Sequence, residues 1–348
     1  MKAKALRIGK AMSAALFVLL LVVAGMKNAL AQTQVATLQH GDDVSVFYGS
    51  NALAEAHAAA ETGDIITLSS GTFVPCEITK AITLRGAGCV KDTISGGYPT
   101  VISGTIIFNV TDTENYLTVE GIYFSAEGYY DGQFFKELHN PKFIKCNFNR
   151  YRCYNANYDY YNSYDAQFTN CMFKNFRFEN SHNTTLINCV AWVEGSWNEV
   201  VTAFNSIVYL LSSVRNWSVY NCIIIHNTNN NNTLGEYCAA YNCIGFQNPY
   251  TVFGSATYNC IEIGGYQDVF ETFGGFEGNF FDFEEPFVLK DEIATGFLGN
   301  DGTEVGIHGG IMPYSSRPTY MIMKRCNVAN KSTIDGKLSV DIEVVTEE

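Results

Sequence analysis

Charged residues are scarce in this chain, and basic residues are the scarcer kind. Lysine and arginine number 22 against 35 acidic residues, charged side chains make up 16% of the sequence, and the net charge is −13. This acidic balance argues against nucleic acid or an anionic membrane surface as a partner. An anionic polysaccharide would also be repelled, unless a basic patch or calcium intervened. With 47% hydrophobic and 14% aromatic residues, the composition is typical of a folded β-rich protein.

The first 31 residues have the pattern of a cleavable export signal. Four basic residues lie between positions 2 and 10, an apolar run occupies 14–23, and Ala29-Leu30-Ala31 has the form of a cleavage site. The apolar run is shorter than a membrane-spanning helix requires. The first cysteine of the chain is Cys76, so no cysteine directly after the run could be modified with a lipid. We expect a secreted or cell-surface chain starting near Gln32, with an uncleaved anchor as the alternative. Without the five basic residues before Gln32, 17 basic and 35 acidic residues remain, a net charge of −18.

A short repeat fills the middle of the chain. The dipeptide Asn-Cys begins at residues 170, 188, 221, 242 and 259, and Lys145-Cys146 and Asn205-Ser206 occupy the same place in two further copies. From Lys145 onward the copies are 25, 18, 17, 16, 21 and 17 residues apart. A repeat this short, with one strand-like core and variable insertions, predicts stacked coils rather than a globule.

The residue that starts each copy, here named the turn position, explains why the chain bends at the same place in every repeat. Aligned segments extend it toward the N-terminus, to turn positions at Ser70, Gly86, Gly104 and Gly121. Glycine and asparagine, which tolerate a positive φ best, occupy nine of the ten turn positions from Gly86 to Asn259, and Lys145 is the exception. We expect a sharp left-handed bend there, hydrogen bonds between stacked asparagine amides, and inward side chains two residues before and one after it.

This pattern predicts an all-β protein, a single-stranded right-handed parallel β-helix of about eleven coils. Segments 63–68, 71–73 and 78–86 resemble the opening of pectin-lyase-like β-helix proteins, over about residues 45–290. That superfamily contains lyases, hydrolases, adhesins and inactive members, so the resemblance implies a fold rather than an activity. We expect a signal peptide at 1–31, the β-helix with its N-terminal cap at 32–290, and an irregular C-terminal cover with a strand-like tail at 291–348. Residues 301–310 resemble a tail that follows β-helices in secreted proteins of Bacteroidetes.

One helix is expected, over residues 50–61. Leu53, Ala56 and Ala60 fall on one of its faces. That face would cover the open end of the first coil, where unpaired strand edges invite aggregation. His57 on this helix is interpreted as a solvated bystander.

Eleven cysteines in an exported chain would usually indicate disulfides, but the repeat argues otherwise. Cysteines at one repeat position stack about 4.8 Å apart with parallel Cβ vectors, which is poor geometry for a bridge. We therefore expect cysteine to serve as a small buried hydrophobe. Cys76 and Cys89 could form an isolated pair, and no metal-binding spacing is present.

Catalytic signatures are missing. Hydrolysis needs carboxylates facing one groove, and elimination needs a strong base beside calcium. No two carboxylates between Lys145 and Glu262 share a repeat position, and the polygalacturonase motifs are absent. Arg177 and Glu194 could meet across adjacent coils as a surface salt bridge. Asn300, Asp301 and Glu304 could ligate calcium but lack the spacing of an EF-hand loop, so no cofactor is assigned.

The binding residues predicted from the sequence lie in an insertion between two turn positions. Tyrosine offers a flat apolar face with a polar tip, suited to sugar rings. The candidates are Tyr151, Tyr154, Tyr158, Asp159, Tyr160, Tyr161 and Tyr164. The alternative is that this segment packs over the flank of the coils. Trp192, Trp197 and Trp217 could form an exposed strip, or be partly buried.

Three functions remain open from the sequence. A secreted, non-catalytic module that binds carbohydrate or a protein partner is favoured by the tyrosine-rich segment and the missing catalytic signatures. A polysaccharide lyase or glycoside hydrolase with a non-standard site is supported by the fold alone, and a structural or adhesive rod is the third. We expect a monomer without nucleic-acid partner or membrane span after signal cleavage.

Overall fold

The computed structural model describes residues 34–91, 97–126, 133–149, 151–152, 162–177, 181–194, 199–226, 232–246, 251–272, 287–315, 322–328 and 340–345. The predicted export signal and most of the tyrosine-rich segment lie outside the described residues. In the described part of the chain, no helix is long and apolar enough to cross a membrane.

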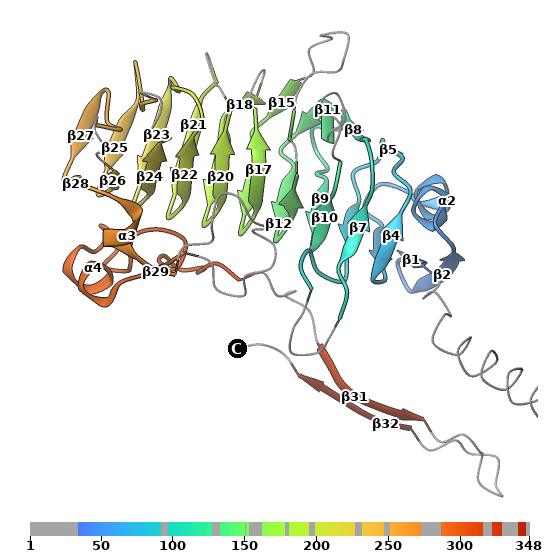
Figure 1. Ribbon diagram of the computed structural model, residues 1–348. Coiled ribbons are helices and arrows are strands. Elements are labelled where there is room, and N and C mark those ends of the chain that lie inside the picture. Colours follow the sequence, from blue (N-terminus) through green and yellow to red (C-terminus); the bar gives the residue numbers. More distant parts are fainter. Residues whose placement is uncertain are drawn as a thin grey trace, which may run out of the picture. The chain divides into compact units, whose positions relative to one another are not determined.

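Short strands stacked coil upon coil form a parallel β-helix, which confirms the predicted fold class (Figure 1). The first sheet has twelve strands, of which β3 to β27 run parallel and in register, while β1 and β2 are antiparallel at the N-terminal edge. In spatial order they are β2 (Asp43–Tyr48), β1 (Val35–His40), β3 (Ile65–Leu68), β6 (Thr83–Arg85), β9 (Thr118–Glu120), β12 (Lys142–Ile144), β16 (Gln167–Thr169), β19 (Thr184–Ile187), β21 (Val201–Phe204), β23 (Trp217–Tyr220), β25 (Ala239–Tyr241) and β27 (Ala256–Tyr258).

The second sheet has sixteen strands and is split in its N-terminal half. One branch holds β4 (Gly71–Phe73), β7 (Thr100–Ile102), β10 (Ile122–Phe124) and β13 (Asn147–Phe148); the other holds β5 (Glu77–Ile78), β8 (Ile106–Val110), β11 (Gln133–His139), β14 (Tyr151–Arg152), β15 (Asn162–Tyr164) and β18 (Ser181–His182). The branches join at β17 (Met172–Phe176), which pairs with both β13 and β14. From there the sheet continues as β20 (Val190–Val193), β22 (Ile207–Leu210), β24 (Ile223–His226), β26 (Ile244–Phe246) and β28 (Ile261–Ile263).

From Gly121 onward the turn positions have the predicted left-handed backbone, but Ser70, Gly86 and Gly104 need correction, and Ser70 does not have a positive φ. Lys145 and the asparagines at 170, 188, 205, 221, 242 and 259 have φ between 44° and 54°. Gly86 does not have a positive φ; it is required because a Cβ there would lie 2.4 Å from the carbonyl oxygen of Gly121. Gly104 does not belong to the column, since it lies between β7 and β8 of the second sheet. One long coil therefore connects Gly86 to Gly121.

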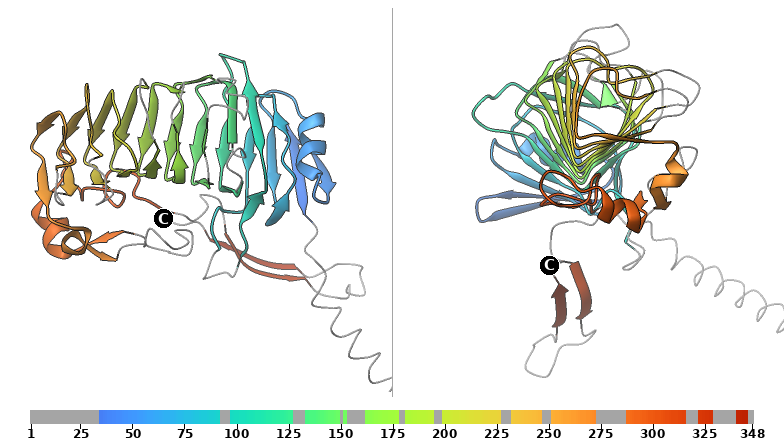
Figure 2. Two further views of the ribbon diagram at one scale, coloured as in Figure 1. Left: turned by 45° about the horizontal axis from the view of Figure 1, so that its top comes forward. Right: turned by 90° about the vertical axis from the view of Figure 1, so that its left-hand side faces the viewer.

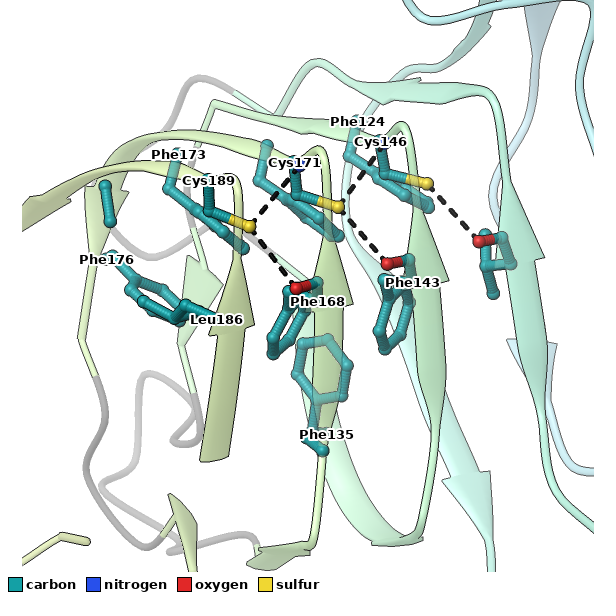
Figure 3. Close-up of a cluster of buried hydrophobic side chains, with 14 of the residues drawn as sticks. Phe124, Phe135, Phe143, Cys146, Phe168, Cys171, Phe173, Phe176, Leu186 and Cys189 are labelled. Atoms are coloured by element: carbon teal, nitrogen blue, oxygen red, sulfur yellow. Dashed lines mark hydrogen bonds between the residues drawn. The ribbon is translucent and has the colours of Figure 1, made fainter. Parts of the chain in front are cut away.

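Aromatic and thiol side chains fill the interior in register (Figure 3). Phe143 stacks on Phe168 with ring centroids 5.1 Å apart, and Phe148 stacks on Phe173 at 4.9 Å. The nine cysteines whose side chains the structure describes all carry free thiols, Cys76 and Cys89 among them. Burial raises the pKa of Cys76 to about 11 and that of Cys171 well above its ordinary value. The prediction of a buried, unbridged cysteine column is confirmed for the described residues.

The thiols also have a polar role that the sequence interpretation missed. The backbone N–H of Cys146 donates to Sγ of Cys171 at 3.5 Å, and the N–H of Cys171 donates to Sγ of Cys189 at 3.4 Å (Figure 3). The N–H of Cys189 donates to Oγ of Ser206 at 3.1 Å, so serine does the same work in the coil that lacks cysteine. A buried N–H needs a partner, and a thiol or hydroxyl in the next coil supplies it.

The N-terminal cap is α2 (Ala52–Ala59), shorter than predicted but with Leu53, Ala56 and Ala60 buried as expected. The expectation for His57 is wrong: the ring is 8% exposed, and its Nε2 accepts the backbone N–H of Thr79 at 3.1 Å. Burial lowers the pKa of His57. Lys80 Nζ donates to carbonyl oxygens at the C-terminal end of the helix, including that of Ala60 at 2.7 Å. His57 therefore ties the cap to the first coils.

The C-terminal part of the chain packs against the outside of the second sheet. It includes α3 (Tyr266–Val269), the pair β29 (Phe270–Thr272) and β30 (Val288–Leu289), α4 (Asp291–Gly296) and the irregular segment 297–315 (Figures 1 and 2). Strands β31 (Ile322–Val328) and β32 (Val340–Val345) form an antiparallel hairpin, as the alternating sequence predicts.

This cover buries an outward apolar column of the second sheet. Val190, Ile207, Ile223 and Ile244 pair in register and are each at most 2% exposed, packed in one cluster with residues of the cover. The approach is close: a Cβ on Gly306, which has φ +94°, would lie 2.7 Å from Cδ1 of Ile223.

The turn-position asparagines hold the cover in place. Nδ2 of Asn188 donates to the carbonyl oxygens of Ile307 and Gly309 at 2.8 and 2.7 Å. Nδ2 of Asn221 donates to Oδ1 of Asn300 at 3.0 Å, and the backbone N–H of Asn300 returns a bond to Oδ1 of Asn221. These amides therefore bind the C-terminal segment instead of one another.

Candidate functional site

Four aromatic rings form a ladder on the outer face of the first sheet. Phe204, Tyr220, Tyr241 and Tyr258 occupy the residue before the turn position in successive coils, at paired positions of β21, β23, β25 and β27. Their centroids are 5.1, 4.7 and 4.7 Å apart, and neighbouring planes differ by 16°, 5° and 6°. Phe204 is 37% exposed and Tyr258 54% exposed. A ladder of this kind follows from strand register, because equivalent side chains of parallel strands lie one strand spacing apart.

The column beside the ladder consists of small, uncharged side chains. Thr202, Ser218, Ala239 and Ala256 pair in register two residues before the aromatic positions and share their face of the sheet. Large aromatic side chains therefore lie next to small side chains over four coils. None of these eight residues is charged.

Coils nearer the N-terminus carry charges in the same place. Arg85 and Glu120, which pair in register before their turn positions, lie 3.7 Å apart from Nε to Oε2. The ladder is thus a neutral zone on the surface of an acidic protein. Partial desolvation and the neighbouring phenols of Tyr220 and Tyr258 raise the pKa of Tyr241 further above neutral pH, where a tyrosine hydroxyl is already uncharged.

Two amides border the ladder at its C-terminal end. Nδ2 of Asn259 donates to Oδ1 of Asn242 at 2.5 Å, so the predicted amide-to-amide bond occurs in this pair. Asn259 is exposed and follows Tyr258 directly. Aromatic rings next to exposed amides combine an apolar contact surface with hydrogen-bonding groups, as small-molecule and glycan sites require.

The tyrosine-rich site predicted from the sequence lies largely outside the described residues. That holds for Tyr154, Tyr158, Asp159, Tyr160 and Tyr161, and for the side chain of Tyr151, whose backbone belongs to β14. Tyr164 is described: its ring lies between those of His139 and His182, with centroids 4.8 Å from each. The prediction that this segment binds a ligand stays a prediction.

The other candidate residues have structural surroundings. Nε of Arg177 lies 3.5 Å from Oε2 of Glu194, as predicted for adjacent coils. Trp217 is fully buried and Trp192 is 9% exposed, so these two form no exposed strip; Trp197 is outside the described residues.

The residues considered for calcium are engaged in other contacts. Asn300 and Asp301 hydrogen-bond to Asn221, and burial raises the pKa of Glu304. Among the described residues, no group of three His, Cys, Asp or Glu side chains could hold a metal ion.

A sequence signal for the ladder exists at the residue before each turn position. It is aromatic in four consecutive coils, at 204, 220, 241 and 258. This position faces outward, so a run of rings there indicates an exposed ladder, whereas the inward positions indicate only the core.

Comparisons of the chain with models of protein families, with curated proteins and with solved structures found no match.

Proposed function

We propose that this chain is an exported protein that binds carbohydrate, and that the aromatic ladder on the first sheet is its binding surface. The observation that carries the proposal is the exposed, in-register stack of Phe204, Tyr220, Tyr241 and Tyr258. Exposed aromatic surface has a cost in water unless a partner covers it. Tyrosine in particular provides rigid amphipathic contact area at low entropic cost.

The chemistry of the ladder favours a glycan over other partners. Its eight residues are uncharged, which leaves hydrogen bonds and apolar contact as the available interactions. An acidic chain repels nucleic acid and anionic surfaces. Pectin-lyase-like β-helices, which the repeat resembles, include proteins that act on polysaccharides, and this supports a carbohydrate ligand by analogy alone.

The test is affinity electrophoresis of the mature protein in gels containing uncharged plant, algal and host polysaccharides. We expect retardation by at least one polysaccharide, and loss of that retardation in the double variant Tyr241→Ala/Tyr258→Ala. The matched control is Tyr116→Ala, which removes a tyrosine that is 46% exposed and lies outside the ladder. Reducing ends and unsaturated products are measured in the same mixtures, because product formation would show an enzyme.

A second variant separates the two candidate surfaces. Replacing Tyr158, Tyr160 and Tyr161 together with alanine removes the core of the tyrosine-rich segment. Retained binding in this variant, with loss in the ladder variant, supports the ladder. The opposite pattern would place the site in the tyrosine-rich segment and contradict the proposal.

A further inference from the structure

In the residues that the structure describes, three rows of the repeat end at Tyr258 and Asn259: the stacked rings, the side-chain amides and the backbone hydrogen bonds between coils. Strand β27 is the last of the first sheet, and the only ring contact of Tyr258 among the described residues is with Tyr241. Within the described part of the chain, one face of the Tyr258 ring thus has no stacking partner. At the other end of the ladder, Phe204 pairs with Ile187 of the preceding strand, so that side of the stack is continued by a side chain.

The amide row and the backbone row stop at the same place. Oδ1 of Asn242 accepts the amide of Asn259, but no described residue donates to Oδ1 of Asn259. The backbone N–H groups of Asn221 and Asn242 each donate to the carbonyl oxygen of the tyrosine in the next coil, at 3.0 and 2.9 Å. The N–H of Asn259 has no such acceptor among the described residues. The outer face of the Tyr258 ring, the acceptor Oδ1 of Asn259 and the donor N–H of Asn259 therefore lie close together, without a partner among the described residues.

Another coil, whether from this chain or a second copy, is a poor occupant of this point. The inward position of β27 is Thr257, which is exposed, in line with the buried Val219 and Ala240. The inward position of β28 is Glu262, also exposed, where Ile224 stands two coils earlier. Inward polar and charged residues on edge strands disfavour strand-on-strand association.

We infer that an uncharged sugar ring takes the place of the next ring in the ladder, stacked on the open face of Tyr258 and hydrogen-bonded to Asn259. This assignment rests on the proposed function and makes Tyr258 its anchor. A sugar ring has an apolar face and hydroxyl groups around its edge, so it can cover the phenol, donate to Oδ1 of Asn259 and accept from its N–H. The inner rings present mainly their edges, because their faces cover one another, and contribute less.

The test is isothermal titration with a panel of uncharged oligosaccharides of two to six residues, made from glucans, mannans, xylans and galactans. For the tightest ligand, Tyr258→Ala should weaken binding by about tenfold or more, since each tenfold corresponds to roughly 1.4 kcal/mol. Tyr258→Phe keeps the ring face and should bind within about threefold of the wild type. Tyr220→Ala removes an inner ring of the ladder and should weaken binding less than Tyr258→Ala does, whereas Tyr116→Ala, outside the ladder, should leave binding unchanged. Melting temperature is followed to show that each variant folds.

The outcomes separate the two claims. Equal loss in Tyr220→Ala and Tyr258→Ala would overturn the anchor but leave binding by the ladder standing. No binding of any panel member by the wild type would overturn the proposed function together with the anchor. Sedimentation velocity tests the competing occupant: a dimer that Tyr258→Ala dissociates would assign the open face to a second copy and overturn the inference.

Discussion

Tyr220 and Ile223 belong to the same coil and lie on either side of the Asn221-Cys222 turn, yet their side chains meet different surroundings. Both point outward, Tyr220 from the first sheet and Ile223 from the second. Tyr220 is half-buried in an exposed ladder, whereas Ile223 is 1% exposed beneath the C-terminal segment. The difference shows that the two outer faces have different roles. The outer face of the second sheet is buried by the C-terminal cover, and the outer face of the first sheet is available to a ligand.

The largest expected effect comes from truncating these two side chains in turn. Ile223→Ala should lower the free energy of unfolding by about 2–5 kcal/mol, because it removes buried methyl groups and leaves a cavity under the cover. Tyr220→Ala should cost less, roughly 1–3 kcal/mol, because it removes two aromatic pairs of about 0.5–1.5 kcal/mol each. Urea denaturation of both variants measures the difference. Equal losses would show that the two faces are not distinct.

A smaller effect is expected from the thiol column, which lies inside the coils beneath both faces. Cys171→Ala leaves the buried N–H of Cys146 without its acceptor and should cost about 1–3 kcal/mol. Cys171→Ser supplies a hydroxyl, as Ser206 does naturally, and should recover part of that loss. If alanine proves as stable as serine in urea denaturation, the thiol acts only as a hydrophobe and the hydrogen-bonding role is wrong.

The smallest effect distinguishes the covered part of the amide row from the uncovered part. Asn188→Gly keeps a residue that tolerates positive φ but removes two bonds to the cover, at a cost of roughly 1–2 kcal/mol. Faster hydrogen exchange in residues 299–310 should accompany it. Asn242→Gly is the matched control, because the described partner of its side chain is Asn259 rather than the cover. Similar exchange in both variants would contradict a holding role for Asn188.

The inward half of this fold could be predicted from the sequence, while the C-terminal cover over the second sheet could not. Bends at Asn170, Asn188 and Asn221 and the buried cysteines after them follow from local residue preferences repeated at fixed spacing. Gly104 misled the alignment, because Ile102-Ser103-Gly104 in the second sheet has the same local pattern as a strand before the turn. A glycine or asparagine after a short strand indicates a bend, but it does not indicate whether that strand belongs to the first or the second sheet.

The cover depends on contacts between residues distant in the sequence, which local patterns do not contain. Asn188 binds Ile307 and Gly309, which are more than 100 residues away, so the sequence around Asn188 does not indicate these contacts. A hint was present in Ile223-Ile224-Ile225, since an uninterrupted apolar run indicates a strand buried on both faces. His57 was misjudged because its partner, the N–H of Thr79, belongs to the coil beneath the helix.

Nitration of tyrosines in the native protein, mapped by peptide mass spectrometry with and without a bound glycan, tests the contrast between the two faces most directly. Tyr258, 54% exposed in the ladder, should be modified in the folded protein and protected when the glycan is present. Tyr314, a residue of the cover that is 8% exposed and packed against the second sheet, should react only after unfolding, because burial also raises the pKa of its phenol and suppresses the reactive phenolate. Equal modification of Tyr314 and Tyr258 in the folded protein, or a Tyr258 that a bound glycan leaves unprotected, would contradict a covered second sheet and a ligand-binding first sheet.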